Sequence, residues 1–524
     1  MDNGYSAIGR ALAINARRFP DKPAIIEAQG VRLNYKSFDE LANQFANRLI
    51  DLGVRKGDRV GVVSGNTAEH IVAIYAISRA GGVSVSFDPK WTLRESVAIQ
   101  AYVKCSIFIY EHIYSSQFSD AAFSGCEFLE FERDRKNFGL SAYTSGADRK
   151  PPSVRVLDDD VSTLLFTSGT TSLPKACIRT NRIIEAGSVK DGQDGLVDIG
   201  SELVVVPVNF GSGRGRVMRQ VYYGGALHLM ESFDAERVAR YLSDYKITSV
   251  SLAPTMCTRL LRLPRIEHLD FSHLRMLRKA GSPFSSDMSA ELIRRVSPQV
   301  YQAFASTEAQ AVTTLHPHEY ESKSGSCGRA LFGVELEIVG PDAGAAGPGQ
   351  EGEIRVRGSQ VCQGYYDRPI ETAQIFRDGW YHSGDIGRID ADGFLYVVGR
   401  TKDMIKTGSI NVSPLEVEQA IQTLAEVRDV SIVGVPDPEW GEIVVAIVVA
   451  ATAMPIALIV EHCRKSLAPY KIPKGVYFVD KIERNSQGKA TLEFRQSCVD
   501  AYLRSRRDGD GGARIEGRGQ ILED

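Results

Sequence analysis

The sequence predicts an α/β protein with at least two domains, and three observations lead to that expectation. The chain has 524 residues, which exceeds what one ordinary hydrophobic core holds. Through most of its first 300 residues, short apolar strands alternate with amphipathic helices, a pattern typical of βαβ units and largely parallel sheets. From about residue 327, short strands broken by Gly and Pro indicate a small barrel or an antiparallel layer.

Composition excludes several classes of function. The chain carries 62 Lys and Arg against 65 Asp and Glu, so it lacks the basic surface of a nucleic-acid-binding protein. No apolar run approaches the roughly 20 residues of a membrane span, and the N-terminus is not of signal-peptide type. Eight scattered cysteines form no CxxC pair, so neither a zinc site nor a disulfide scaffold is indicated. We expect a reduced, cytoplasmic monomer or homodimer.

The first 160 residues contain strand and helix signals in turn. Strands are predicted over 23–27, 59–64 and 83–87, and a helix over 68–79. Ser37 with Glu40 predicts a capping box that begins a helix over 38–53, and Thr92 with Glu95 predicts a second one. The polar stretch 131–155 is predicted to be a loop that leads to a central strand.

The alternation continues after residue 200 and changes character near residue 400. Further strands are predicted over 202–206, 226–230, 248–252 and 274–278, with helices over 235–245 and 286–296. A compact C-terminal unit is predicted from helices over 415–424 and 456–466 and strands over 429–433 and 442–449. The Gly- and charge-rich tail 504–524 is predicted to be disordered. We therefore divide the chain into domains 1–401 and 402–503.

The stretch from Leu164 to Ala176, LLFTSGTTSLPKA, places an apolar strand before a loop of Gly, Ser and Thr. Such a loop offers backbone N–H groups and hydroxyl donors, and Lys175 adds an ammonium, which together suit a polyphosphate. It is not a Walker A loop, because Pro174 precedes the lysine. A polar surface turn is the alternative interpretation.

Two later stretches place polar side chains around strand ends. In YQAFASTEA, residues 301–309, Glu308 offers a carboxylate of the kind that Mg²⁺ prefers, and Phe304 offers a face on which a purine can stack. In YHSGDIG, residues 381–387, Asp385 could accept hydrogen bonds from both hydroxyls of a ribose. For each stretch, an ordinary exposed turn is the alternative.

These stretches, together with GRTKDMIKTG at 399–408 and YKIPKGVYFVDKIERNSQGK at 470–489, resemble the motifs of the ANL superfamily of adenylate-forming enzymes, in the family's order. That family comprises acyl-CoA synthetases, peptide-synthetase adenylation domains and beetle luciferases. The resemblance covers essentially residues 5–500. It implies a large N-terminal domain of two mixed α/β sheets plus a small β-barrel, followed by a small mobile α+β C-terminal domain.

The resemblance also implies roles for individual residues. Lys489, Thr307 and Glu308 would be catalytic, Thr167 and Glu308 would hold Mg²⁺, Lys402 would be the hinge, and Gly408 would lie on the thiol side. The ATP or AMP site would comprise Thr167, Ser168, Gly169, Thr170, Thr171, Lys175, Gly281, Ser282, Pro283, Phe304, Ala305, Ser306, Thr307, Asp385, Val397 and Arg400. The carboxylic acid would lie against Asn209, Phe210, Lys279 and Ala303.

The implied reaction is ATP-dependent ligation of a carboxylic acid to CoA through an acyl-adenylate. Two alternatives stay open: transfer to a carrier-protein thiol or an amine, and a catalytically silent nucleotide binder with Ser172, Ala305 and Ser409 where the family usually has Gly. Cations near the acid-binding stretches, Arg214, Arg216 and Lys279, lead to the hypothesis of a polar acid or one with a second carboxylate.

Overall fold

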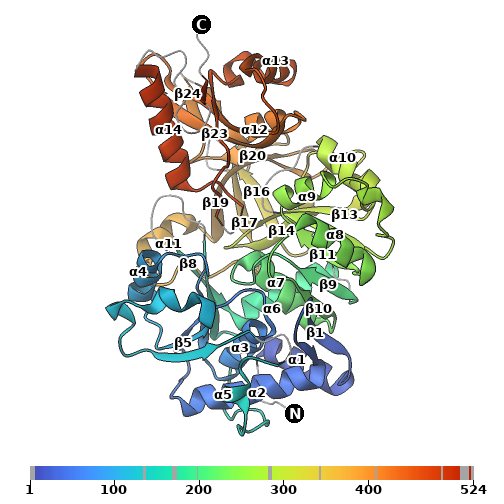
Figure 1. The fold of residues 1–524 in the computed structure, drawn as a ribbon, viewed down its shortest axis with the longest axis vertical. Helices are drawn as coiled ribbons and strands as arrows, with labels where there is room; N and C mark the ends of the chain where they lie inside the picture. Colours follow the sequence, from blue (N-terminus) through green and yellow to red (C-terminus); the bar gives the residue numbers. More distant parts are fainter. Residues whose placement is uncertain are drawn as a thin grey trace.

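The computed structural model describes residues 6–133, 137–167, 174–196, 199–280, 286–340, 344–407, 410–485, 488–507 and 519–520. Three sheets build a large N-terminal body, and a smaller C-terminal unit lies at one end of it (Figure 1). This confirms the prediction of a large and a small domain. Within the described ranges, no helix is both long enough and apolar enough to cross a membrane.

The first sheet has six strands, and all but one of its neighbouring pairs are parallel. The exception is the antiparallel pair β7–β8, which flanks the Gly/Ser/Thr-rich loop. In sheet order the strands are β6 (Glu127–Phe131), β5 (Ile107–Glu111), β3 (Arg59–Val63), β4 (Val83–Ser86), β7 (Val161–Phe166) and β8 (Ala176–Thr180).

The second sheet has nine strands, parallel in its centre and antiparallel at both edges. In sheet order they are β15 (Arg329–Ala330), β14 (Gln310–Leu315), β13 (Val300–Ser306), β12 (Met276–Ala280), β11 (Ser249–Leu252), β9 (Ser201–Val204), β10 (Ala226–Leu229), β1 (Pro23–Glu27) and β2 (Arg32–Asn34). The prediction of two mixed α/β sheets is thus confirmed.

Helices cover these sheets, and one of them lies wholly inside the protein. All twelve residues of α3 (Ala68–Arg79) are buried, because the helix contacts β3 and β4 of the first sheet and β1 of the second. The other helices of the large domain are α1 (Ala7–Arg18), α2 (Tyr35–Asp51), α4 (Leu93–Val103), α5 (Ser141–Thr144), α6 (Asn181–Gln193), α7 (Gly211–Tyr222), α8 (Ala235–Asp244), α9 (Pro254–Leu261), α10 (Ser286–Arg295) and α11 (Pro369–Ile375).

The third sheet is antiparallel and carries part of the candidate site. Its strands are β16 (Glu335–Val339), β17 (Gly352–Arg357), β19 (Trp380–Ile389), β18 (Phe376–Arg377) and β20 (Leu395–Arg400), the last paired with β19. Among the described residues, no strand pairing closes this sheet into a barrel. Of the two predictions for this region, the antiparallel layer is therefore the one that the structure shows.

The C-terminal unit is built on the long hairpin of β23 (Val427–Asp437) and β24 (Gly441–Ala450). Its two faces are covered separately: α12 (Pro414–Gln422) and α13 (Ile456–Ser466) pack on one, and α14 (Leu492–Arg507) packs on the other. The remaining strands are β21 (Ile405–Thr407), β22 (Ile410–Val412), β25 (Gly475–Phe478) and β26 (Gly519–Gln520).

Three local predictions need correction. Helix α2 begins three residues early, because the Asn34 side chain caps it by accepting a hydrogen bond from the Ser37 amide at 2.8 Å. The predicted loop 131–155 contains the short helix α5. The predicted disordered tail overlaps α14, which ends at Arg507, and Gly519–Gln520 pairs with β25. The capping box of Thr92 and Glu95 is confirmed.

Gly328 offers a test of the packing between β14 and β20. Its φ is +84°, and an added Cβ would lie 1.9 Å from the Thr314 carbonyl. Gly328→Ala should therefore destabilise by about 1–2 kcal/mol through the strained φ and a further 1–3 kcal/mol through the forced displacement. The urea unfolding midpoint measures this change.

Gly53→Ala is the matched control, because Gly53 also has a positive φ of +93° but no atom within 4 Å of an added Cβ. Equal destabilisation by the two substitutions would contradict the close packing at Gly328.

Candidate active site

A cavity of about 1880 Å³ lies where the carboxyl ends of the central strands of the second sheet meet the third sheet and the C-terminal unit. Ligands of parallel α/β sheets generally bind at this end of the strands. The volume exceeds that of an ordinary small-molecule pocket, which is at most about 1,000 Å³. The cavity is thus large enough for more than one small ligand.

The turn between β13 and β14 brings Thr307 and Glu308 into this cavity. The Tyr365 hydroxyl donates a hydrogen bond to Glu308 Oε1 at 2.8 Å, and Lys175 Nζ lies 4.9 Å from the centre of the same tyrosine ring. The Arg179 guanidinium donates to the backbone carbonyl of Thr307. Tyr365 therefore contacts both the predicted metal-binding carboxylate and the lysine of the phosphate loop.

Thr167 and Lys175 lie at the two ends of the phosphate loop, and the Thr167 amide donates to the Lys175 carbonyl at 2.9 Å. The predicted residues Ser168, Gly169, Thr170 and Thr171 lie outside the described residues, as do Gly281, Ser282, Pro283 and Gly408.

Asp385 and Arg400 face each other across the antiparallel pair β19–β20. Arg400 Nε donates to Asp385 Oδ1 at 2.7 Å, and the aspartate is buried. Burial raises the pKa of Asp385, and the attraction of Arg400 acts in the opposite direction. The second oxygen of the carboxylate accepts no hydrogen bond from the described part of the chain, so Asp385 retains capacity to accept a ligand hydroxyl.

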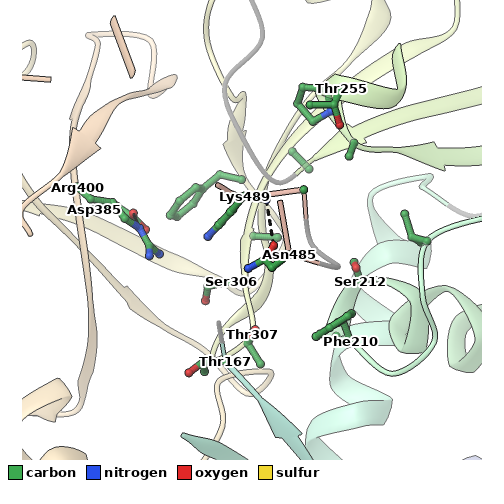
Figure 2. Close-up of a pocket in the computed structure, with 18 of the residues that line it drawn as sticks. Thr167, Phe210, Ser212, Thr255, Ser306, Thr307, Asp385, Arg400, Asn485 and Lys489 are labelled. Atoms are coloured by element: carbon green, nitrogen blue, oxygen red, sulfur yellow. Dashed lines mark hydrogen bonds and ion pairs between the residues drawn. The ribbon is translucent and has the colours of Figure 1, made fainter. Parts of the chain in front are cut away.

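Lys489 reaches the cavity from the C-terminal unit, and Figure 2 shows it between the Asp385–Arg400 pair and the side chains of Phe210 and Ser212. Asn485 holds the loop by accepting a hydrogen bond from the Lys489 amide at 3.0 Å. Burial, together with nearby Arg400, lowers the pKa of the Lys489 ammonium.

Contacts within the C-terminal unit and contacts with the large domain also hold the loop of Lys489 in place. Arg484 pairs with Asp429 at 2.6 Å and donates to the Gly488 carbonyl at 2.8 Å. A Cβ at Gly488 would lie 3.6 Å from Thr255 Oγ1, so the loop lies against α9 of the large domain. Arg262 at the end of α9 donates to the carbonyls of Val427 and Arg428. The two domains are thus joined by hydrogen bonds beside the cavity.

The remaining predicted nucleotide and acid residues divide into two groups. Phe304, Ala305, Ser306, Val397, Phe210, Ala303 and the hinge candidate Lys402 line the cavity. Asn209 and Lys279 do not. The Asn209 amide donates to the Phe87 carbonyl at 2.8 Å, and Lys279 Nζ lies 2.5 Å from Ser289 Oγ and over the Tyr320 ring. The prediction that they contact the acid is therefore corrected.

The reason for the Lys279 error is the alternation of side chains along a strand. In β12, Arg278 and Lys279 point to opposite faces, and it is Arg278 that lines the cavity. Burial lowers the pKa of Lys279 to about 8. Sequence analysis also missed Tyr365 and Arg179, whose roles depend on contacts between distant segments; knowledge of which face of β12 lines the cavity could have identified Arg278.

Oxygen ligands for Mg²⁺ are present at the site. Glu308 offers a carboxylate and Thr167 a hydroxyl at the edge of the same cavity. The described residues contain no cluster of three His, Cys, Asp or Glu that could hold a metal ion. Mg²⁺ that is bound partly through nucleotide phosphates needs only one or two protein ligands, so the residues fit the ion.

A lysine at the end of the Gly/Ser/Thr-rich stretch, a buried carboxylate beside an arginine and a lysine that enters from a second domain are what a nucleotide-dependent enzyme of the adenylate-forming class would need. Comparison with known families agrees. The AMP-binding enzyme family model matches residues 12–366, and the AMP-binding enzyme C-terminal domain matches residues 416–489. The chain belongs to the AMP-binding enzyme family, within the ANL superfamily.

Relatives of known activity match nearly the whole chain. A 2-succinylbenzoate–CoA ligase of Oceanobacillus iheyensis is 31% identical over 90% of this chain and 95% of its own. A feruloyl-CoA synthase of an Amycolatopsis species is 32% identical over the same shares of the two chains. The o-succinylbenzoate CoA synthetase of Bacillus subtilis, solved with an acyl-adenylate intermediate, is 25% identical, covers 93% of this chain and 97% of its own, and has a TM-score of 0.82.

The chain is an ATP-dependent acid–CoA ligase that works through an acyl-adenylate, with ATP, Mg²⁺ and CoA as the acceptor thiol. The predictions of fold class and reaction are confirmed.

Tyr365→Phe should impair the metal-dependent step, because it removes the hydroxyl that orients Glu308 and leaves the ring beneath Lys175. A hydrogen bond to a charged group contributes about 1.5–3 kcal/mol, so the Mg²⁺ concentration for half-maximal ATP–pyrophosphate exchange should rise about tenfold or more. Tyr366→Phe is the neighbouring control. An unchanged Mg²⁺ requirement in Tyr365→Phe would show that Glu308 needs no such orientation.

Proposed function

We propose that this chain activates its carboxylic acid in the domain arrangement described here, with Lys489 as the residue that brings the two anionic reactants together. The observation that carries the proposal is the position of Lys489, which lies half-buried beside Asp385 and Arg400 although it belongs to the other domain. A lysine in an exposed turn would not need such an environment. We assign Thr307 and Glu308 as the other catalytic residues.

In the first step, a carboxylate oxygen of the acid attacks the α-phosphorus of ATP. A bond forms between that oxygen and phosphorus, and the bond to the pyrophosphate oxygen breaks, so pyrophosphate is released and the acyl-adenylate is formed in the site. Two anions must approach each other, and negative charge develops on the phosphoryl oxygens. The Lys489 ammonium, held in position before the reaction, lowers the energy of this arrangement through electrostatics and positioning.

The nucleotide would lie along the edge formed by the second and third sheets. Asp385 would accept the ribose hydroxyls, Phe304 would lie against the purine, and Lys175 and Thr307 would contact the phosphates. Glu308 and Thr167 would hold Mg²⁺, which neutralises phosphate charge when bound. The loop residues that the resemblance assigns to the nucleotide and that lie outside the described ranges stay predictions from the sequence.

In the second step, we propose that the C-terminal domain rotates about Lys402 and presents the segment of Gly408 to the thiol. The thiol loses its proton to solvent, its sulfur forms a bond to the acyl carbon, and the bond between that carbon and the phosphate oxygen breaks, which releases AMP. Lys402 is exposed and lies two residues beyond the end of β20, so its backbone can change without disrupting a strand. The domain boundaries that go with this proposal are 1–401 and 402–503, with a tail from 504 to 524.

The identity of the acid, the location of the protein, the alternative acceptor and the assembly are also proposed. The relatives are named for different kinds of acid, among them succinylbenzoate, ferulate and long-chain fatty acids, so they do not identify the acid of this chain. All eight cysteines are free, which supports a reduced, cytoplasmic location. A carrier-protein thiol stays the alternative acceptor, and a monomer or homodimer the expected assembly.

Lys489→Ala should separate the two steps. Acid-dependent ATP–pyrophosphate exchange should fall by about a thousandfold or more, which corresponds to roughly 4 kcal/mol of barrier. Thioester formation from synthetic acyl-adenylate and CoA should persist, because that step does not use the ammonium. The exposed Lys465→Ala in α13 is the control. Equal losses in both steps would exclude the proposed role of Lys489.

The pH dependence of exchange provides a second test. Burial lowers the pKa of Lys489 below its usual 10.5, so activity should be complete below the lowered pKa and disappear as the pH rises through it. Lys489→Arg should move this alkaline limb upward, because a guanidinium keeps its proton to higher pH. An alkaline limb that is identical in the two proteins would assign the titration to another group.

A further inference from the structure

Three arginines converge on one oxygen of a buried aspartate in the wall of the cavity beside α7. Asp191 Oδ2 lies 3.0 Å from Arg219, 3.3 Å from Arg278 and 3.6 Å from Arg216. Arg219 also pairs with Glu202 at 2.5 Å. All of these residues except Glu202, which is fully buried, line the cavity.

This cluster is not electrically balanced. Three guanidinium groups face two carboxylates, and no third carboxylate pairs with them in the part of the chain that the structure describes. Arginine does not release its proton under ordinary conditions, so the cluster cannot become neutral by titration. An unneutralised buried charge is costly, and an anion from outside the protein would remove the imbalance.

Arg216 is the member of the cluster with the weakest protein contacts. Its ion pair with Asp191 is the longest of the three, and its Nη1 is buried with no hydrogen-bond partner among the described residues. Arg278, in contrast, also donates to the Leu196 carbonyl at 3.2 Å.

Arg214, a neighbouring cation, is not available to bind an anion in the same way. Its guanidinium donates to the Ser84 and Ser86 hydroxyls at 3.0 and 2.7 Å, so it joins α7 to the first sheet. The predicted involvement of Arg214 and Lys279 in acid recognition is thus replaced by Arg216 and its cluster.

Arg216 lies on the side of α7 that faces the acid. Ser212 in the first turn of α7 lines the cavity across from the Asp385–Arg400 pair, as Figure 2 shows. Four residues along a helix make about one turn and advance about 6 Å, so Arg216 lies on the same face and further from the helix start. The cation is therefore displaced along the cavity wall from Ser212 and Phe210.

We propose that Arg216 binds a second carboxylate of the acid, so that the preferred substrate is a dicarboxylic acid. One carboxylate faces Lys489 and reacts, and the other neutralises the cluster of Arg216, Arg219 and Arg278. The planar guanidinium suits a carboxylate, which it can bind through two parallel hydrogen bonds. This proposal rests on the proposed function, because it assigns the acid to the same cavity.

The test is ATP–pyrophosphate exchange without CoA on matched acids: aliphatic and aromatic dicarboxylic acids, each compared with its monomethyl ester. The wild-type enzyme should prefer the best dicarboxylic acid over its monoester by about 10- to 100-fold in kcat/KM. Arg216→Met should abolish this preference by losing activity on the dicarboxylic acid, while activity on the monoester stays within about threefold.

A stability measurement separates recognition from a structural role. Arg216→Met leaves two guanidinium groups with two carboxylates, so its melting temperature should equal or exceed that of the wild type. Arg219→Met removes the residue that pairs with both carboxylates and should lower it. Arg237→Met on the exposed side of α8 is the matched control and should change neither stability nor preference.

Three results would overturn the proposal in distinguishable ways. A wild-type preference for monoesters would exclude a second carboxylate at the site. Equal losses on both members of a pair in Arg216→Met would show that Arg216 contacts the reacting carboxylate instead. Absence of exchange with every acid would overturn the adenylation reaction itself, and the assignment of Arg216 with it.

Discussion

The ion pair between Asp385 and Arg400 is the interaction on which the rest of the active site depends. It joins neighbouring strands of the third sheet, and the Thr401 amide beside it donates to the Gly384 carbonyl at 2.9 Å. The chain leaves the large domain at this point. The same pair of charges surrounds Lys489, which arrives from the C-terminal unit. This pair of a buried aspartate and an exposed arginine thus links the candidate ribose site, the exit to the second domain and the lysine to which we assign the catalytic role.

This arrangement explains why a two-domain protein suits the reaction. The buried ammonium of Lys489 costs desolvation energy, which the carboxylates of Asp385 and Glu308 offset only while the domains are docked. Contacts that dock the two units in the described part of the chain include the Arg262 bonds to two carbonyls, the bond from the Ser413 hydroxyl to the Val398 carbonyl at 2.7 Å and the approach of the Gly488 loop to Thr255. The proposed rotation about Lys402 would have to break these contacts before a thiol could approach.

Much of the fold could be predicted from the sequence because strand and helix periodicities are local. The prediction that Ser37 caps helix α2 was wrong, because the Asn34 side chain accepts a hydrogen bond from the Ser37 amide and Asn34 is the cap. A local motif cannot show which of two nearby polar residues becomes the cap. The nucleotide residues that line the cavity were found through motifs. Tyr365 was not, because its contacts join segments far apart in the chain. The choice of Lys279 over Arg278 depends on which face of β12 lines the cavity, and the contact of Asn209 with the Phe87 carbonyl joins distant segments, so a local motif shows neither.

A single-turnover experiment tests the central claim most directly. Wild-type enzyme would be mixed with α-labelled ATP, Mg²⁺ and a reactive acid from the matched set, without CoA, quenched over time and analysed for nucleotides and pyrophosphate. The account predicts one equivalent of acyl-adenylate with pyrophosphate, followed on addition of CoA by AMP and the thioester. Formation of ADP and phosphate, or release of pyrophosphate only after CoA is added, would contradict it.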